Sequence, residues 1–209
     1  MRKLLTEFIG TFFLVLAVGL TATTGVDNAP IIIGLALTVM VYMGGSISGA
    51  HYNPAVSVAA TMRGVLPLRE LGGYVAVQLA GAIAAALMVR VITGSTFAPA
   101  PALAATPLEA LLVEILFTFA LALVILNVAV AKRNEGNQFY GAAIGLTVTV
   151  GVALGGGISG GVFNPAVGIG PTLVHAALSG GSWSALWLYL VGPLAGAAVA
   201  AVVFGLQER

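Results

Sequence analysis

The run ISGGVFNPAVGIGP, residues 158–171, places an Asn-Pro pair inside an otherwise apolar segment. The chain carries nearly the same run earlier, as ISGAHYNPAVSVA, residues 47–59. Proline suits the first helical position because its φ is fixed near helical values and it lacks an N–H, and asparagine is a preferred N-cap before it. Each pair therefore predicts a helix start. A single copy is adequately explained as a helix cap, whereas two matching copies indicate a shared purpose.

The composition indicates a membrane protein. Of the 209 residues, 7% are charged and 59% are hydrophobic, and the mean hydropathy is +1.08. Ordinary globular domains contain about 25% charged residues. A soluble chain of this size could not bury so much apolar surface, so the lipid bilayer is an expected partner. The net charge of +1 and the lack of a basic run give no indication of nucleic-acid binding.

Hydropathy predicts six membrane-spanning helices, each near the roughly 20 residues needed to cross a bilayer. They cover residues 4–24, 31–48, 68–92, 107–131, 138–157 and 184–205. Two shorter apolar pieces, 54–62 and 165–176, follow the two Asn-Pro pairs and are too short to cross. Short apolar pieces of this kind predict re-entrant half-helices, so the expected fold is an all-α membrane protein with one transmembrane domain over residues 1–209.

The two halves of the chain repeat one another. The matching pairs are Glu7 with Glu114, Gly34 with Gly145, Asn53 with Asn164, and Gly81 with Gly196. They predict a duplicated unit, with repeat 1 over about 1–100 and repeat 2 over about 101–209. Each repeat has an odd number of spans, so the second enters the membrane from the opposite side. The result is an inverted repeat whose half-helices point at each other. The link between the repeats, residues 93–107, is rich in Pro, Ala and Thr and predicts a surface loop.

The positive charges predict the orientation. With the N-terminus inside, seven of the eight basic residues fall on the inner side, namely Arg2, Lys3, Arg63, Arg69, Lys132, Arg133 and Arg209. Only Arg90 falls toward the outside. The positive-inside rule thus predicts cytoplasmic termini. The expected location is the plasma or inner membrane of the cell. Trp183 and Trp187 fall at the outer start of the last span, where an aromatic belt is expected.

Two half-helices that begin at the bilayer centre bring two partial positive charges and two asparagine amides together. Amide donors at one narrow place would hydrogen-bond a passing water or hydroxyl oxygen, and the converging helix ends would repel hydronium and cations. Such a constriction suits a neutral, oxygen-bearing solute.

With the six spans, the doubled Asn-Pro-Ala loops, and the paired Glu and Gly residues, the sequence resembles the aquaporin (major intrinsic protein) family over its whole length. The resemblance implies a right-handed bundle of six transmembrane helices and two re-entrant half-helices. It also implies a passive channel for water or small uncharged solutes, a homotetramer with one pore per subunit, and no cofactor. The pore constriction would comprise Asn53, Pro54, Ala55, Asn164, Pro165 and Ala166.

The chain departs from the family at the outer selectivity filter. Family members usually have an arginine three residues after the second asparagine, and here that residue is Val167. The other three filter positions fall on Ile33, Val152 and Gly161. Valine supplies neither the fixed charge nor the donors of arginine. We therefore expect a wider and more apolar outer mouth, with cation exclusion resting mainly on the asparagines.

Three other polar residues have two interpretations each. Glu7 and Glu114 fall at membrane depth, where a carboxylate suggests a proton relay. Their duplication favours a structural role instead, as acceptors for unpaired N–H groups of the re-entrant loops. His51 is interpreted as a hydrogen-bonded loop residue or, less favourably, as a pH sensor. The sequence has no set of residues with metal-ligand or catalytic spacing, so neither a metal site nor an enzyme is expected.

Three functions remain open at the level of sequence. The first is a passive channel for water and small neutral solutes. The second is a channel that prefers glycerol, urea, ammonia, hydrogen peroxide or a dissolved gas over water. The third is a secondary transporter, because inverted repeats also serve alternating access. A coupled transporter needs a mid-membrane ion site, for which only Glu7 and Glu114 qualify.

Overall fold

The computed structural model describes residues 1–209 and is all-helical. Its α-helices are α1 (Arg2–Thr24), α2 (Ala29–Ser48), α3 (Pro54–Met62), α4 (Leu68–Thr93), α5 (Pro107–Ile125), α6 (Tyr140–Ser159), α7 (Pro165–Ser179) and α8 (Leu188–Gln207). A π-helical turn, Leu126–Val130, continues α5, and a 3-10 turn, Lys132–Asn134, follows it. The sequence predicted one helix over 107–131, whereas the structure widens its last turn.

Six helices are long and apolar enough to cross a membrane, as predicted: α1, α2, α4, α5 with its extension, α6 and α8. Their ends lie within a few residues of the predicted ones. The largest shift is at α8, which begins at Leu188 rather than at residue 184. Trp183 and Trp187 precede α8 and are exposed. The half-helix α3 has the predicted bounds, and α7 continues to Ser179.

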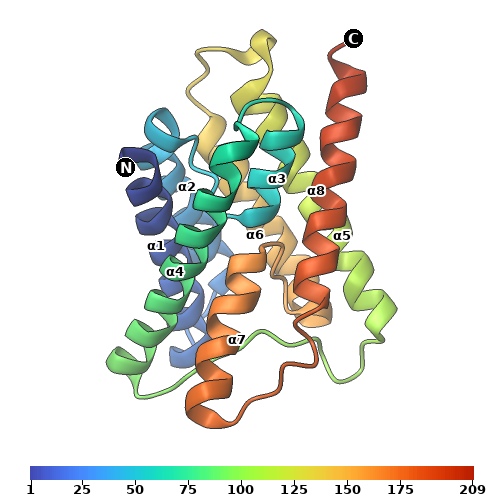
Figure 1. Cartoon of the computed structure of the whole chain (residues 1–209). Helices are drawn as coiled ribbons and strands as arrows, with labels where there is room; N and C mark the ends of the chain where they lie inside the picture. The colour runs from blue at the N-terminus through green and yellow to red at the C-terminus, as the bar shows by residue number, and fades with distance from the viewer.

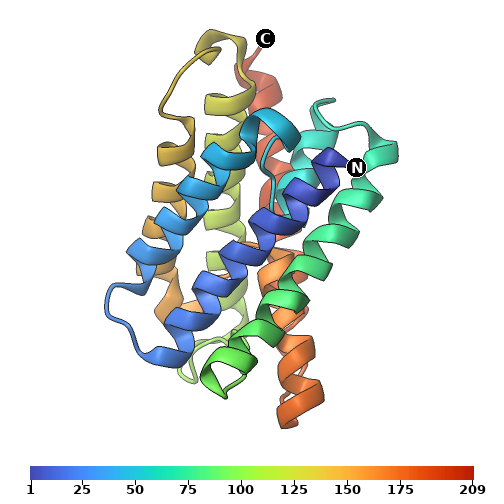
Figure 2. The ribbon, with the colours of Figure 1, turned by 90° about the vertical axis from the view of Figure 1, so that its left-hand side faces the viewer.

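The half-helices α3 and α7 lie inside the bundle and approach its middle from opposite ends (Figure 1). Both chain termini lie at one end, which also carries the α3–α4 and α5–α6 connections (Figures 1 and 2). The seven basic residues predicted to share one side therefore lie at that end. Arg90, in the last turn of α4, lies at the other. For brevity, the end with the termini is called the inner end below and the opposite one the outer end.

The two repeats make the same close helix contacts. A Cβ built on Gly81 of α4 would lie 2.6 Å from the carbonyl oxygen of Phe8 in α1. In the second repeat, Gly196 of α8 meets the carbonyl oxygen of Ile115 in α5 in the same way. Phe8 and Ile115 follow the matched residues Glu7 and Glu114, so equivalent glycines contact equivalent backbone atoms. Small residues at these crossings let the backbones touch, as membrane helices require.

The link between the repeats is more than a surface loop. It crosses the outer end of the bundle between α4 and α5 (Figure 1). The ring of Phe97 packs against Gly19 of α1, and Pro99 lines a cavity inside the bundle. The backbone N–H of Ala102 donates to the carbonyl of Ile158 at 3.0 Å. The Pro-, Ala- and Thr-rich composition of the link correctly predicted a segment without regular structure but did not indicate these contacts.

Candidate functional site

The two re-entrant loops have nearly the same backbone. α2 and α6 each end at a glycine with a left-handed conformation, Gly49 at φ 88° and Gly160 at φ 95°. Three residues further on, Tyr52 (φ 49°) and Phe163 (φ 51°) also have positive φ. Aromatic residues rarely adopt this conformation. Contacts from the rest of the fold must therefore hold both loops in place.

Glu7 holds the first loop. Its buried carboxylate accepts hydrogen bonds from the Ser48 hydroxyl (2.6 Å), the His51 N–H (2.9 Å), the Tyr52 N–H (2.7 Å) and the Gln78 side-chain amide (2.8 Å). The two backbone donors belong to the irregular loop, where no helix partner is available. An ionised carboxylate is an acceptor only, so it suits a position surrounded by donors.

Glu114 holds the second loop in the same way, but with fewer partners. Its carboxylate accepts from the Ser159 hydroxyl (2.7 Å), the Val162 N–H (2.9 Å) and the Phe163 N–H (2.6 Å). The side-chain amide that completes the set around Glu7 has no counterpart here. Both carboxylates have the contacts of loop-supporting residues, and these contacts occupy the acceptor atoms that a proton relay would use.

Two tyrosines fix the helix ends from which the loops leave. The Tyr74 hydroxyl donates to the carbonyl of Ser48 at 2.8 Å, and the Tyr189 hydroxyl donates to the carbonyl of Ser159 at 2.6 Å. Sequence reasoning missed these residues together with Gln78. A signal was present, since Tyr74 and Tyr189 precede the matched glycines Gly81 and Gly196 by the same number of residues.

The two loops are joined to each other through the asparagines. The side-chain amide of Asn53 donates to the carbonyl of Phe163 at 2.8 Å, and that of Asn164 donates to the carbonyl of Tyr52 at 2.9 Å. Each amide nitrogen has two hydrogens. One hydrogen is spent on the opposite loop, which leaves one N–H per asparagine without a partner in the protein, rather than the two expected from sequence.

The same asparagines cap the half-helices, as predicted. The Asn53 side-chain oxygen accepts from the Ala55 N–H at 2.9 Å, and the Asn164 oxygen accepts from the Ala166 N–H at 2.9 Å. The prolines Pro54 and Pro165 are the first residues of α3 and α7. The positive ends of two helices therefore meet where the asparagines lie, because each loop places its half-helix start against the other loop.

One narrow cavity, of about 80 Å³, contains both asparagines in its wall. All four residues expected at the outer filter, Ile33, Val152, Gly161 and Val167, also line it. Among its 20 lining residues only three side chains are polar, those of His51, Asn53 and Asn164. The remaining wall comes from aliphatic residues of α1, α2, α5 and α6, from Val56 of α3 and Val167 of α7, from the loops and from Pro99.

A second cavity, of about 600 Å³, opens at the inner end. Its wall shares His51, Val56, Ile125 and Ile144 with the narrow cavity, so the two adjoin. Together they form a passage that leads from the inner end to the two asparagines. Glu7, Glu114 and the two Pro-Ala pairs are not in its wall. The two glutamates support the loops that are, and the Pro-Ala pairs begin the half-helices.

Comparison with known proteins identifies the fold. Residues 1–204 match the family model of the Major intrinsic protein family. The chain belongs to this family. It is similar to Aquaporin NIP1-4 of Oryza sativa subsp. japonica, with 38% identity over 99% of this chain and 77% of the relative. It is also similar to Nodulin-26 of Glycine max, with 36% identity over 99% of this chain and 78% of the relative.

A solved structure supports the same assignment. The structure of the aquaglyceroporin from Plasmodium falciparum matches with a TM-score of 0.87 and 26% identity, over 97% of this chain and 94% of that one. Family members are channels. The chain is therefore an integral membrane protein and a passive channel for water and small solutes, not an enzyme. Of the functions left open by the sequence, the passive channel is confirmed at this level.

His51 is the one titratable side chain in the wall of the narrow cavity. Its Nδ1 lies 3.0 Å from the Ser57 hydroxyl, which in turn lies 3.1 Å from the carbonyl of Asn53. The Gln78 amide also donates to Ser57, at 3.0 Å. His51 is thus a hydrogen-bonded loop residue of this aquaporin-family channel, linked through Ser57 to the network around Glu7.

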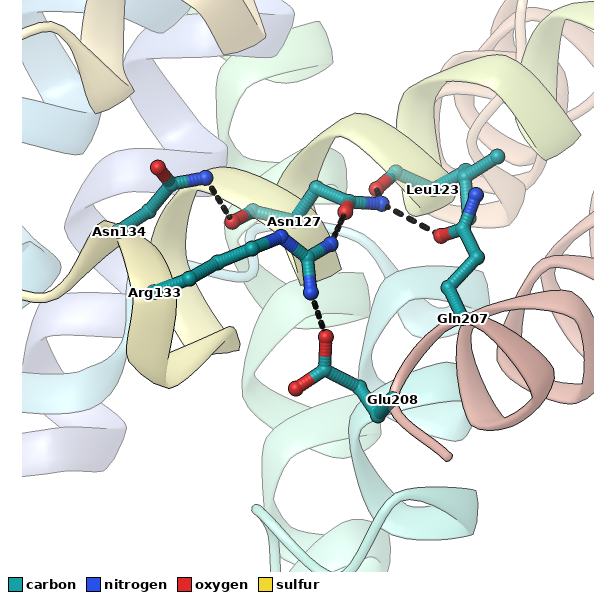
Figure 3. A network of polar contacts seen from close by, with 6 residues as sticks. All are labelled: Leu123, Asn127, Arg133, Asn134, Gln207 and Glu208. Carbon is teal, nitrogen blue, oxygen red and sulfur yellow. Dashed lines mark hydrogen bonds and ion pairs between the residues drawn. The ribbon is translucent and has the colours of Figure 1, made fainter.

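The connection between α5 and α6 borders the inner cavity, and polar contacts join it to the end of α8 (Figure 3). Asn127 of the π-helical turn donates to Gln207 near the end of α8 at 3.1 Å, and its carbonyl accepts from the Asn134 side chain at 2.9 Å. Arg133 contacts both Asn127 and Glu208. These bonds join the inner mouth to the C-terminal end of the chain. No sequence pattern indicates the contacts to Gln207 and Glu208, because these residues lie 75 or more positions from their partners.

Proposed function

We propose that the channel conducts small uncharged solutes as well as water, through a constriction at the two Asn-Pro-Ala motifs. Asn53 and Asn164 face the passage, and Pro54, Ala55, Pro165 and Ala166 begin the half-helices that position them. The outer selectivity filter consists of Ile33, Val152, Gly161 and Val167. Because this filter lacks an arginine, it is wider and more apolar than that of a strict water channel, and solutes of the size of glycerol or urea pass it.

One observation carries the proposal: outward of the asparagines, no side chain in the wall of the narrow cavity carries a charge or a strong hydrogen-bond donor. A filter arginine would hydrogen-bond water and fill part of the cross-section. Valine and isoleucine instead offer contact surface for the carbon skeleton of a solute. The exclusion of cations then rests on the two free asparagine N–H groups and on the meeting helix ends.

The backbone of the second loop offers hydrogen-bond acceptors suited to a solute with hydroxyl groups. Gly160, Gly161 and Val162 line the narrow cavity, and their carbonyl oxygens accept no hydrogen bond within the protein. Opposite this loop the wall is aliphatic, from residues such as Ile33 and Val148. A passage with acceptors on one side and hydrocarbon on the other suits a short molecule with hydroxyl or amide groups on a carbon skeleton.

We also propose the arrangement of the chain in the membrane. Residues 1–209 form one channel domain of two repeats, about 1–100 and 101–209, and four copies assemble into a homotetramer with one pore each. The termini are cytoplasmic, and the plasma or inner membrane is the site of action. The orientation is supported by the placement of seven basic residues at the end of the bundle that carries the termini, in accord with the positive-inside rule.

The test is stopped-flow light scattering on liposomes containing the purified wild-type protein. An impermeant osmolyte measures water flux, and gradients of glycerol and of urea measure solute flux. The proposal predicts faster shrinkage than in protein-free liposomes, with weak temperature dependence, followed by rapid re-swelling in glycerol or urea. Water flux without either solute flux would contradict the wide filter. Flux of ammonia, hydrogen peroxide or a gas alone would point to a narrower, drier passage.

A further inference from the structure

The inner end of the bundle has a cavity that does not belong to the pore. Its volume is about 800 Å³, and its wall comes from the first turn of α1, the last turn of α2 and the first turns of α4. Three basic side chains line it, those of Arg2, Lys3 and Arg69, against one acidic side chain, that of Glu70. The channel function uses none of these residues.

The charges in this basic cavity are not balanced. Lys3 and Glu70 form an ion pair at 3.2 Å. The guanidinium groups of Arg2 and Arg69 have no hydrogen-bond or ion-pair partner in the chain, whose other ion pair joins Arg133 to Glu208. α1 and α4 both begin at the cavity, and neither has a side-chain N-cap. Their free N–H groups add two partial positive charges to the two unpaired guanidinium groups.

The surroundings indicate the chemical class of ligand. The cavity lies at the ends of the membrane-spanning helices α1, α2 and α4. Leu5 (61% exposed) and Leu68 (75% exposed), next in sequence to its wall residues Leu4 and Arg69, present exposed apolar side chains. Guanidinium groups bind phosphate oxygens in pairs. A ligand that combines a phosphate with hydrocarbon chains could contact the guanidinium groups with its phosphate and the exposed leucines with its chains. We propose that this cavity binds the headgroup phosphate of an anionic phospholipid, such as phosphatidylglycerol, from the leaflet on the side of the termini.

The site connects to the support of the first re-entrant loop. Tyr74 lines the basic cavity, and its hydroxyl donates to the carbonyl of Ser48, the last residue of α2. The Ser48 hydroxyl donates in turn to Glu7, which holds the loop. A bound headgroup thus ties together the starts of α1 and α4 beside this network. We therefore expect the lipid to stabilise the folded channel.

The experiment compares lipids and variants in neutral detergent. Phosphatidylglycerol or phosphatidylcholine with the same acyl chains is added to the full-length protein, and the thermal midpoint is measured together with bound lipid by native mass spectrometry. The test variant is R2Q/R69Q. The control is K132Q/R209Q, which removes the same charge from exposed residues at the inner end but outside the basic cavity.

The expected result is that phosphatidylglycerol raises the midpoint of the wild type and the control by several degrees more than phosphatidylcholine does. The test variant should bind phosphatidylglycerol about tenfold more weakly and lose the extra stabilisation. Since neither guanidinium has a partner, its midpoint without lipid should match the wild type. If R2Q/R69Q does not fold, the single variant R69Q gives the same comparison with a smaller loss.

Three results would overturn the site. Equal stabilisation by both lipids would mean that no anionic group is recognised. If R2Q/R69Q keeps the full extra rise in thermal midpoint with phosphatidylglycerol, or if the control loses as much of it, the lipid binds outside this cavity. Inorganic phosphate alone producing the full shift would show a site for free phosphate rather than for a lipid. None of these readings depends on solute flux, so failure here is distinguishable from failure of the proposed function.

Discussion

The first re-entrant loop and the second share one backbone but present different side chains. His51, Ser57 and Gln78 in the first repeat correspond to Val162, Gly168 and Pro193 in the second. The glutamates, serines and tyrosines that hold the loops are doubled, and so are the two asparagines in the passage, whereas His51, Ser57 and Gln78 are not. The residues that support the constriction are thus common to both repeats, whereas the polarity of the side chains along the passage differs between its inner and outer sides. The inner side of the passage has the network of His51, Ser57 and Gln78, and the matched positions on the outer side carry no side chain that could form it.

The largest effect should come from removing a supporting carboxylate. In Glu7→Gln an amide faces four donors, and at least one buried N–H group loses its acceptor. We expect a loss of about 3 kcal/mol of stability. Glu114→Gln, facing three donors, should lose less. Thermal unfolding of the two purified variants in one detergent measures the difference, and an equal loss would show that the extra partner of Glu7, Gln78, adds nothing.

The next largest effect should come from exchanging the residues at the matched positions 57 and 168, which are Ser57 in the first repeat and Gly168 in the second. A Cβ at Gly168 would lie 2.5 Å from the Cβ of Tyr189. Gly168→Ser should therefore destabilise the protein by about 2 kcal/mol through overpacking. Ser57→Gly leaves a small gap and an unpaired histidine nitrogen, for which we expect about 1 kcal/mol. Thermal unfolding of the two variants measures these losses. If Gly168→Ser loses no more stability than Ser57→Gly, close packing at residue 168 does not explain why the second repeat lacks the polar network.

A smaller effect is expected from giving residue 51 of the first loop the apolar side chain of its match in the second loop, Val162. His51→Val replaces the one polar side chain that the narrow and inner cavities share. Water flux in liposomes should fall by about threefold, since the passing water loses a hydrogen-bonding partner. The protein should still fold, because the backbone N–H of residue 51, not the ring, bonds Glu7. An unchanged flux would mean that the ring does not contact the permeating water.

The smallest effect should come from the exposed contacts at the inner mouth. Arg133→Gln removes the ion pair with Glu208, and such surface pairs contribute about 0.5 kcal/mol. The midpoint of thermal unfolding should therefore barely change. A large drop would show that the link between the α5–α6 connection and the end of α8 is a main support of the fold.

Much of the fold was predictable because its signals are local. Six apolar spans and two short pieces after Asn-Pro gave the helices, and the duplication at Glu7 and Glu114 gave the loop supports. The contacts that were missed are long-range. Nothing near Phe97 or Pro99 indicates that the link folds against the bundle. The use of one asparagine hydrogen by the opposite loop depends on a carbonyl more than 100 residues away.

The most direct test of the apolar outer filter is the ratio of glycerol to water permeability in Val167→Arg and in the wild type, measured in matched liposomes. An arginine there restores a charge and narrows the outer cavity. The ratio should fall by about tenfold or more, mainly through glycerol. Val56→Arg, at the matched position of the first loop, is unsuitable as a control because that residue lines both cavities. A ratio unchanged by Val167→Arg, in a protein that still conducts water, would contradict the filter proposed here.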